Sequence, residues 1–326
     1  MKILLVRVSS LGDVLHNLPM VADLLRRHPG ATIDWVVEEG YVSLVRLNPH
    51  VRKIIPWALR RWRKSLGKAA TRAEIKGFFR NLREEEYDYV FDTQGLLKTG
   101  IIMGAARVRK GGKKVGLANG SEGSGYEGIS RIFHTDSIPL SPRTHAVARG
   151  RMVAGAALDY PVATAPDFGL PAPDASNRPG FLPQEDYAVF FHGTARAAKK
   201  WADANWIARG KALAPMPVLL PWGSAAERQD AETLAAAIPN ARVLPKLSMM
   251  DAVTLAQHAR LAVGVDTGLT HIAAAFVRPT IEIYCDSPKW KTEGNWSERI
   301  VNLGELGAPP SSEEVIASAR RLLADA

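Results

Sequence analysis

The chain has 326 residues, of which 46% are hydrophobic and 23% charged, with a formal net charge of +9 and one cysteine, Cys285. This length predicts two domains of about 150 residues each, and the composition is that of a globular protein. A single cysteine excludes an internal disulfide and a thiolate metal cluster, and no apolar run reaches the roughly 18 residues of a membrane span.

The first half of the chain alternates short apolar runs with helical patterns, which is typical of a parallel sheet covered by helices. We predict strands at residues 2–8, 32–37 and 87–92, with helices after the first and third. The amino-terminal run is only as long as a strand and is followed by Arg7, unlike a secretory signal. We therefore expect a cytoplasmic protein.

The second half repeats the same alternation. We predict strands at residues 187–192, 218–222, 241–244, 261–265 and 280–284 and helices at residues 225–237, 249–259 and 269–276. A final helix at 311–326 opens with the capping signal Ser-Ser-Glu-Glu and either closes its own domain or returns to the first. Six prolines in the stretch between the halves indicate a linker. The predicted organisation is an N-terminal domain at 1–160, a linker at 161–183 and a C-terminal domain at 184–326.

The positive charge is concentrated in one segment. Residues 51–80 contain ten Lys or Arg and one acid, so the rest of the chain is balanced. The apolar residues of 57–74 recur every three or four positions, which predicts one amphipathic basic helix. Such a helix suits phosphates or an anionic membrane surface, and a solvated basic face is the alternative. A glycine-rich stretch at 116–128 is either a lid or a tolerated insertion.

Asp13 lies in the stretch SSLGD, directly after the first predicted strand. In an open parallel sheet, ligands bind beyond the carboxyl ends of the strands, where a free carboxylate can act as a general base on a hydroxyl. Asp is also favoured at helix starts, so capping of the next helix is the alternative. Ser9, Ser10 and Gly12 are also placed for the capping role, and both interpretations stay open.

A second junction between strand and helix, VGVDTGLTH, carries Asp266 directly after a strand and His271 in the helix that follows. The amides of Thr267, Gly268 and Leu269, with the Thr267 hydroxyl, predict a small anion site suited to a phosphate. We expect His271 to add a hydrogen bond to the same phosphate. A purely structural histidine is the alternative.

Two further loops follow predicted strands of the second half. The stretch FFHGTARAAKKW offers Thr194, Arg196, Lys199 and Lys200 without any acid, as a diphosphate leaving group requires. Glu227 follows the next strand, where a carboxylate holds ribose hydroxyls or lies solvated at a helix start. No P-loop, dinucleotide fingerprint or zinc spacing is present. We therefore expect catalysis by a base and positive groups, without a bound metal or cofactor.

These motifs resemble those of the lipopolysaccharide heptosyltransferases of glycosyltransferase family 9. The resemblance extends over nearly the whole chain and rests on six stretches in order: SSLGDVLHNLP, DWVVEEGY, IPWALRRWRK, FDTQGLLKTG, LLPWGS and VGVDTGLTH. It implies a GT-B fold, in which two Rossmann-like domains with parallel sheets face a central cleft. It also implies inverting transfer of L-glycero-D-manno-heptose from ADP-heptose to the first Kdo of Kdo2-lipid A, in the cytoplasm at the inner membrane.

The resemblance also implies roles for individual residues. Asp13 would be the general base and Lys199 would neutralise the departing ADP. Thr194 and the segment from Asp266 to His271 would bind the diphosphate, and Glu227 the ribose. The residues that would bind the anionic acceptor are Arg60, Arg61, Arg63 and Lys64. Alanines at positions 195, 197 and 198 depart from the family, whose donor loop tends to have a second threonine and acidic residues.

Two alternatives to this function stay open. Another transferase of the family, such as heptosyltransferase II, would share the donor and use an acceptor that already carries heptose. A non-catalytic nucleic-acid-binding protein is suggested by the sequence pI near 9.7. Against it, the charge lies in one segment, and no helix-turn-helix, RNA-recognition or zinc motif is present.

Overall fold

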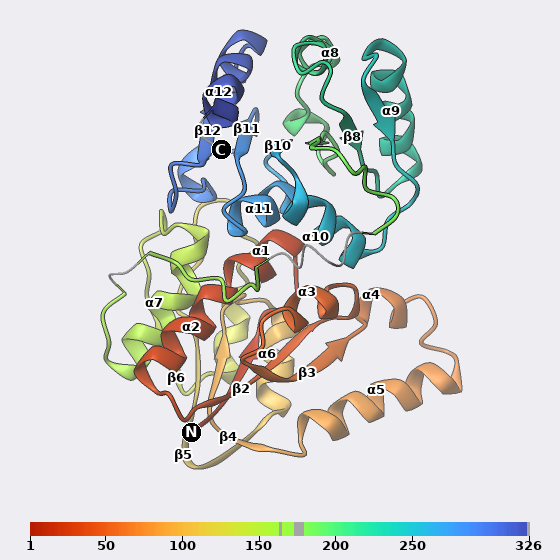
Figure 1. Ribbon diagram of the computed structural model, residues 1–326. Helices are drawn as coiled ribbons and strands as arrows, with labels where there is room; N and C mark the ends of the chain where they lie inside the picture. The colour runs from red at the N-terminus through yellow and green to blue at the C-terminus, as the bar shows by residue number, and fades with distance from the viewer. Residues whose placement is uncertain (163–164, 173–178, 325–326) are drawn as a thin grey trace. The chain divides into compact units, whose positions relative to one another are not determined.

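The computed structural model describes residues 1–162, 165–172 and 179–324, and within them the chain forms two compact units (Figure 1). Unit 1 is Met1–Gly169 and unit 2 is Leu170–Ala326. Each unit contains one six-stranded sheet in which neighbouring strands run parallel. The predicted linker, 161–183, includes the point of division and lies partly outside the described residues.

The sheet of unit 1 has the strand order β3-β2-β1-β4-β5-β6. Its strands are β1 Lys2–Val6, β2 Thr32–Glu38, β3 Val51–Trp57, β4 Glu86–Asp92, β5 Arg107–Leu117 and β6 Asp136–Ile138. Its helices are α1 Leu11–His16, α2 Leu18–Arg27, α3 Val42–Arg46, α4 Leu59–Trp62, α5 Ala69–Leu82, α6 Leu97–Ala105 and α7 Ala146–Leu158, with 3₁₀ turns η1 Glu39–Tyr41 and η2 Gly128–Phe133. The apolar strand β1 is paired on both edges and buried on both faces, which is why its sequence is continuously hydrophobic.

The sheet of unit 2 has the order β12-β11-β10-β7-β8-β9. Its strands are β7 Ala188–Phe191, β8 Val218–Leu220, β9 Ala241–Val243, β10 Leu261–Val265, β11 Thr280–Tyr284 and β12 Ile300–Gly304. Its helices are α8 Asp203–Lys211, α9 Ala225–Ala237, α10 Met249–His258, α11 Gly268–Ala275 and α12 Ser312–Ala324, with 3₁₀ turns η3 Ala197–Lys199 and η4 Lys289–Lys291.

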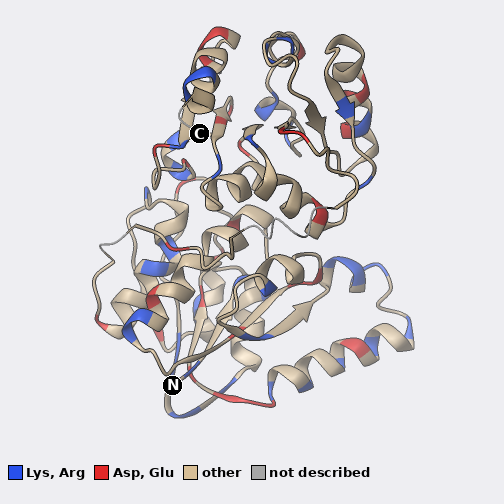
Figure 2. Cartoon of the chain, viewed as in Figure 1, with Lys and Arg blue, Asp and Glu red and all other residues tan. Residues whose placement is uncertain are grey.

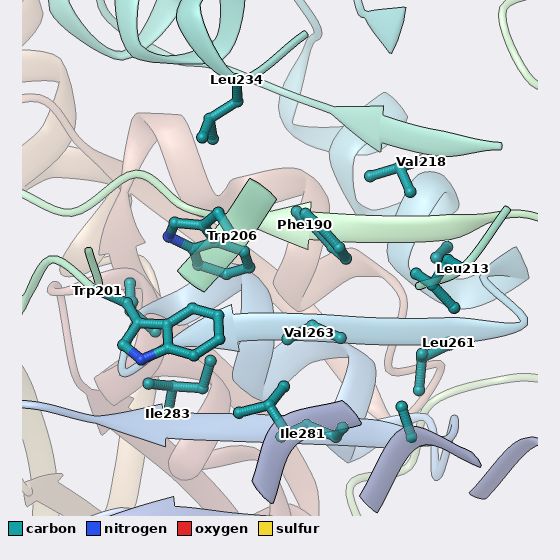
Figure 3. Packing of buried hydrophobic residues seen from close by; sticks show 14 of the residues in the cluster. Phe190, Trp201, Trp206, Leu213, Val218, Leu234, Leu261, Val263, Ile281 and Ile283 are labelled. Atoms are coloured by element: carbon teal, nitrogen blue, oxygen red, sulfur yellow. The ribbon is translucent and has the colours of Figure 1, made fainter. Parts of the chain in front are cut away.

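Aromatic side chains fill the core on one face of the second sheet (Figure 3). Trp206 of α8 lies between Phe190 of β7 and Trp201, with ring centroids 5.0 Å away in each case. The final helix α12 adds Val315, Ala319 and Leu322 to this core at the 3.6-residue period of a helix. It therefore closes the core of unit 2.

Both sheets have the same topology. In each unit the first strand lies between the second and the fourth, so the order of connection reverses between β1 and β4 and between β7 and β10. This is the order of a Rossmann fold, in which ligands bind beyond the carboxyl ends of the strands at the reversal point. The predicted class, two Rossmann-like α/β domains with parallel sheets, is confirmed.

Several elements differ from the prediction. Strands β3, β5, β6 and β12 are absent from the prediction, because charged residues interrupt the apolar pattern of β3 and β5, β6 is very short, and Asn302 and Gly304 break the pattern of β12. The single basic helix expected over residues 57–74 is also wrong. The segment ends strand β3, forms the short helix α4, turns, and starts α5 at Ala69. Leu66, expected on the apolar stripe, is 53% exposed, so the periodicity does not mark a buried face.

Candidate active site

Asp13 lies beyond the carboxyl end of β1, at the reversal point of the first sheet. It is the third residue of α1, whose N-cap is Ser10. One carboxylate oxygen pairs with the Arg7 guanidinium, and the other accepts from the Ser10 amide at 2.9 Å and the Ser10 hydroxyl at 2.8 Å. The side chain is still 37% exposed. Asp13 thus contributes to the helix cap and also presents a carboxylate to solvent.

The charge state of Asp13 is set by its partners. Desolvation alone would raise the pKa of its carboxyl group, but the Arg7 guanidinium and the Ser10 hydrogen bonds outweigh it and hold the pKa well below its usual range. The carboxylate is therefore ionised at every physiological pH. A general base must be ionised and accessible, and Asp13 meets both conditions, while its low pKa makes it a weak proton acceptor.

A second strand holds the surroundings of Asp13 in place. Gln94, just after β4, accepts hydrogen bonds from the amides of Val8 and Ser9. Lys98 of α6 donates to the Ser9 hydroxyl at 3.2 Å. These contacts tie the loop after β1 to the loop after β4, so the two strands at the reversal point share one site.

The four predicted acceptor-binding cations lie on α4 and the turn after it, where Figure 2 shows Lys and Arg gathered. All four are exposed. Arg61 forms ion pairs with Glu39 at 3.0 Å and Glu74 at 2.8 Å, so its charge is matched locally. Arg60 lies over the Tyr41 ring, 5.9 Å from its centroid. Within the described residues no ion pair holds the remaining three cations, Arg60, Arg63 and Lys64.

In unit 2, the two predicted donor motifs meet across the reversal point of the second sheet. Lys199, from the loop after β7, places its Nζ 2.5 Å from Oδ2 of Asp266, which follows β10. Strands β7 and β10 are direct neighbours, which brings these two loops together. The ion pair with Asp266 fixes the Lys199 ammonium, and the side chain is 19% exposed, so part of it stays accessible to a ligand.

His271 does not have the role we expected. Its Nδ1 lies 2.7 Å from Glu282 of β11 and its Nε2 lies 3.0 Å from Asp266, and the ring is 3% exposed. Both ring nitrogens are therefore occupied by carboxylates, and neither is left to bind a phosphate in this arrangement. The histidine instead joins two buried acids, so the expected hydrogen bond to the phosphate is absent from this arrangement.

The contacts of Asp266 complete a buried charge network. Its oxygens also accept hydrogen bonds from Ser287 at 2.6 Å and Thr292 at 3.1 Å. Burial would raise the pKa of Asp266, but the hydrogen bond and charge of His271 and the Lys199 ammonium hold it well below its usual range. Burial would lower the pKa of His271, but the charge of Glu282 and the hydrogen bonds to both acids raise it to about 10. The network is thus charged at neutral pH.

This network predicts a pH-dependent stability. Because the pKa of His271 is raised in the folded state, its contribution is complete below its ordinary pKa of about 6.5 and is lost as the pH rises through about 10. His271→Gln leaves the buried Glu282 without its cation and leaves Asp266 with Lys199 as its cation, and we expect a loss of about 3–5 kcal/mol near pH 7. Denaturant unfolding between pH 6 and pH 10 measures the free energy of unfolding of the wild type and of this variant as a function of pH. The variant His50→Gln, at an exposed histidine, should keep the wild-type dependence of stability on pH. The wild-type dependence in His271→Gln would contradict the prediction.

The start of α11 faces the same loops. Thr267 is its N-cap and its hydroxyl makes no capping hydrogen bond, while Gly268 and Leu269 form the first turn. All three are half-buried, and so is Thr194 in the loop after β7. Because the first amides of a helix have no partner within it, this end attracts an anion beside the Lys199 ammonium. The arrangement suits a phosphate.

Glu227 lies near this site and also caps a helix. Its Oε2 accepts hydrogen bonds from the amides of Gly223 at 2.7 Å and Ser224 at 2.9 Å, in a capping box at the start of α9. A Cβ placed on Gly193 would lie 2.9 Å from its carboxyl carbon, so the loop after β7 touches it. The capping alternative is therefore observed for Glu227. The predicted ribose contact stays a prediction, to be made from the exposed side of the carboxylate.

Sequence reasoning missed two charged residues on which these sites depend. Arg7 directly follows the apolar run of β1 and holds Asp13, and Glu282 lies inside the apolar strand β11 and holds His271. The signal was present in both cases, since a charge within a run of buried residues is costly unless it has a partner. Within the described ranges no three His, Cys, Asp or Glu side chains are grouped as a metal site. No helix in the described part of the chain could cross a lipid bilayer.

The sequence is similar to curated heptosyltransferases. Residues 75–319 match the model of glycosyltransferase family 9 (heptosyltransferase). Lipopolysaccharide heptosyltransferase 1 of Pseudomonas aeruginosa is 40% identical over 87% of this chain and 78% of its own length. The Escherichia coli K12 protein of the same name is 35% identical over 87% of this chain and 88% of its own length. Lipopolysaccharide heptosyltransferase 2 of Salmonella typhimurium is 25% identical over 93% of this chain and 88% of its own length.

Solved structures agree with the sequence comparison. The E. coli heptosyltransferase WaaC with ADP superposes with a TM-score of 0.85 at 31% identity, covering 99% of this chain and all of that one. The structure of WaaC with ADP-2-deoxy-2-fluoro heptose gives a TM-score of 0.78 and covers 100% of this chain and 99% of that one. The predicted GT-B class and a glycosyltransferase activity are confirmed, and the nucleic-acid-binding alternative is dropped. The chain belongs to glycosyltransferase family 9, the heptosyltransferases.

Proposed function

We propose that this protein is a lipopolysaccharide heptosyltransferase of the first type, which moves L-glycero-D-manno-heptose from ADP-heptose to the first Kdo of Kdo2-lipid A. The observation that carries the choice is the gap in identity, 40% and 35% to proteins named heptosyltransferase 1 against 25% to one named heptosyltransferase 2. A heptosyltransferase II, with an acceptor that already carries heptose, is the second candidate. ADP and an ADP-heptose analogue bound to WaaC support the donor.

The reaction is proposed as a direct displacement with inversion. The Kdo hydroxyl attacks the anomeric carbon of the heptose, its proton passes to an Asp13 carboxylate oxygen, and the bond between that carbon and the ADP oxygen breaks from the opposite side. The released diphosphate gains a negative charge, which Lys199 and the amides at the start of α11 stabilise. The fixed Lys199 ammonium supports this role, because it needs no reorganisation when the charge develops.

The donor is assigned to unit 2. The diphosphate would lie against Thr194, Lys199 and the first turn of α11, which come from neighbouring strands. Asp266 holds the ammonium in position and need not touch the phosphate. Glu227 would accept a ribose hydroxyl with the oxygen that does not cap α9. We propose that no metal takes part, because cationic groups for the leaving diphosphate are supplied by the chain itself.

The acceptor is assigned to unit 1. Kdo carboxylates and lipid phosphates are anionic, and Arg60, Arg63 and Lys64 are exposed cations whose charge no carboxylate of the described chain matches through an ion pair. Such a surface also suits peripheral association with the anionic cytoplasmic face of the inner membrane. Arg61 would have to exchange its partners Glu39 and Glu74 for the acceptor, so we expect it to contribute less affinity than Arg63.

ADP release by the purified protein tests the proposal. The protein receives ADP-heptose and Kdo2-lipid A in the presence of a chelator, and a heptosylated acceptor is run in parallel. Release with Kdo2-lipid A alone is the expected result. Release only with the heptosylated acceptor would move the protein to the second type. Activity that disappears with chelator and returns with a divalent cation would contradict the metal-independent mechanism.

A further inference from the structure

Arg149 is a buried cation that the mechanism above does not use. It belongs to α7, which packs against α1 and α2 (Figure 1). Its side chain is 6% exposed, yet its Nε and Nη2 have no hydrogen-bond partner among the described residues. A buried guanidinium normally has a carboxylate or several carbonyls beside it, because an uncompensated buried charge is costly. Arg149 therefore needs an explanation.

The same helix shows how a structural arginine is satisfied. Arg151, two residues later, is 5% exposed and uses its Nε and Nη2 to bind both oxygens of Asp23, at 2.6 and 3.1 Å. In Arg149 the corresponding two nitrogens are the ones without a partner. These nitrogens form the edge of the guanidinium that matches the two oxygens of a carboxylate. Arg149 thus has an unpaired edge of the same kind that Asp23 binds on Arg151 two residues later.

Arg149 lies in the electrostatic neighbourhood of the general base. Burial and the charge of Arg7 lower the pKa of Arg149 to about 10, and Asp13 opposes this, so the group is a cation at pH 7. The carboxylate that acts on Arg149 is already occupied, because Asp13 is held by Arg7 and Ser10.

We propose that Arg149 is an acceptor-binding residue that takes the carboxylate of the sugar acid whose hydroxyl Asp13 deprotonates. The proposal rests on the proposed function, because it assumes that this sugar is an acid. Contact requires the buried guanidinium to reorient, and neither of the two nitrogens has a hydrogen bond to lose. A lipid phosphate has similar chemistry, but the carboxylate belongs to the same sugar ring as the attacking hydroxyl and so lies beside Asp13.

The test compares two variants on matched acceptors. Arg149→Gln removes the charge, and Arg149→Lys keeps the charge without the two-nitrogen edge. We expect Arg149→Gln to raise the acceptor KM by roughly 10- to 100-fold, as loss of a charged hydrogen bond predicts, and to leave the ADP-heptose KM unchanged. With an acceptor whose attacked Kdo carries an alcohol in place of its carboxylate, the acceptor KM of the wild type should rise by the same factor. The acceptor KM of Arg149→Gln should rise no further. An acceptor without lipid phosphates should raise the acceptor KM of the wild type and of Arg149→Gln by the same factor.

A control variant and a stability measurement separate binding from structure. Lys110→Gln removes an exposed cation from the amino-terminal half of β5, away from the carboxyl ends of the strands, and should keep wild-type kinetics. Arg149→Met should melt no lower than the wild type, because it removes a buried charge without a partner. Equal losses by Arg149→Gln on the acid and alcohol acceptors, or a lowered melting temperature of Arg149→Met, would overturn the proposal in favour of a structural role.

The proposal has a readout that does not depend on turnover. Free Kdo should raise the melting temperature of the wild type and have no effect on Arg149→Gln, and the reduced sugar should have no effect on either. If the wild type failed to turn over Kdo2-lipid A but showed this shift, the proposed function would fail and the anion site would stand. Turnover by the wild type with no shift and no difference between acceptors would leave the function and overturn the role of Arg149.

Discussion

Asp13→Asn will lower turnover by about 10² to 10⁴ and leave the affinity for ADP-heptose near the wild-type value, because a positioned base contributes a factor of this size. An asparagine keeps the shape of the side chain and an oxygen that can accept from the Ser10 amide, so the cap of α1 is largely preserved. It cannot take the proton of the attacking hydroxyl. The measurements are kcat with Kdo2-lipid A and the Kd for ADP-heptose by calorimetry.

The chain contains a matched control for the capping function. Asp251 is the third residue of α10, and its Oδ2 accepts from the Ser248 amide at 3.1 Å and the Ser248 hydroxyl at 2.7 Å, the same pattern that Asp13 makes with Ser10. Asp251→Asn should cost the same capping contribution, without the ion pair to Arg7 that Asp13→Asn also loses, and leave turnover unchanged. If both variants showed the same small stability loss and normal turnover, Asp13 would be a helix cap and the assignment of the base would be wrong.

Lys199→Met will weaken ADP binding about tenfold and lower kcat by about 10² or more, because the ammonium meets the diphosphate and gains strength as charge develops on it. The methionine keeps the length of the side chain. Asp266 retains His271, Ser287 and Thr292 as partners, so we expect the fold of unit 2 to survive. Steady-state kinetics and ADP titration measure the two effects separately.

Lys200 provides the comparison for this experiment. It is the next residue, but it pairs with Asp230 of α9 and is 43% exposed. Lys200→Met removes the same charge from the same loop and should change kcat less than about twofold, as expected for an exposed ion pair. Loss of activity in Lys200→Met together with normal kinetics in Lys199→Met would transfer the role to Lys200.

The sequence determined the fold class because the apolar pattern reports burial directly. Strands such as β1 and β10 lie between two neighbours with helices on both faces, so their apolar runs are nearly continuous and easy to recognise. Strand β5 is charged along most of its length and β12 is an edge strand, and neither has that pattern. The basic segment shows the opposite error, because a helical period without burial predicted one helix where the chain turns between two.

The sequence also placed Asp13, Lys199 and Asp266 after the carboxyl ends of strands, where parallel strands share one edge of a sheet and ligands are expected. Only the tertiary structure decided which groups face one another. Strand order puts Lys199 against Asp266, and the buried acid Glu282 on β11 holds one ring nitrogen of His271. The packing of α7 on α1 leaves Arg149 with an unpaired edge near the base. Such pairings depend on contacts between residues far apart in the chain, and local periodicity and motif spacing carry no information about those contacts.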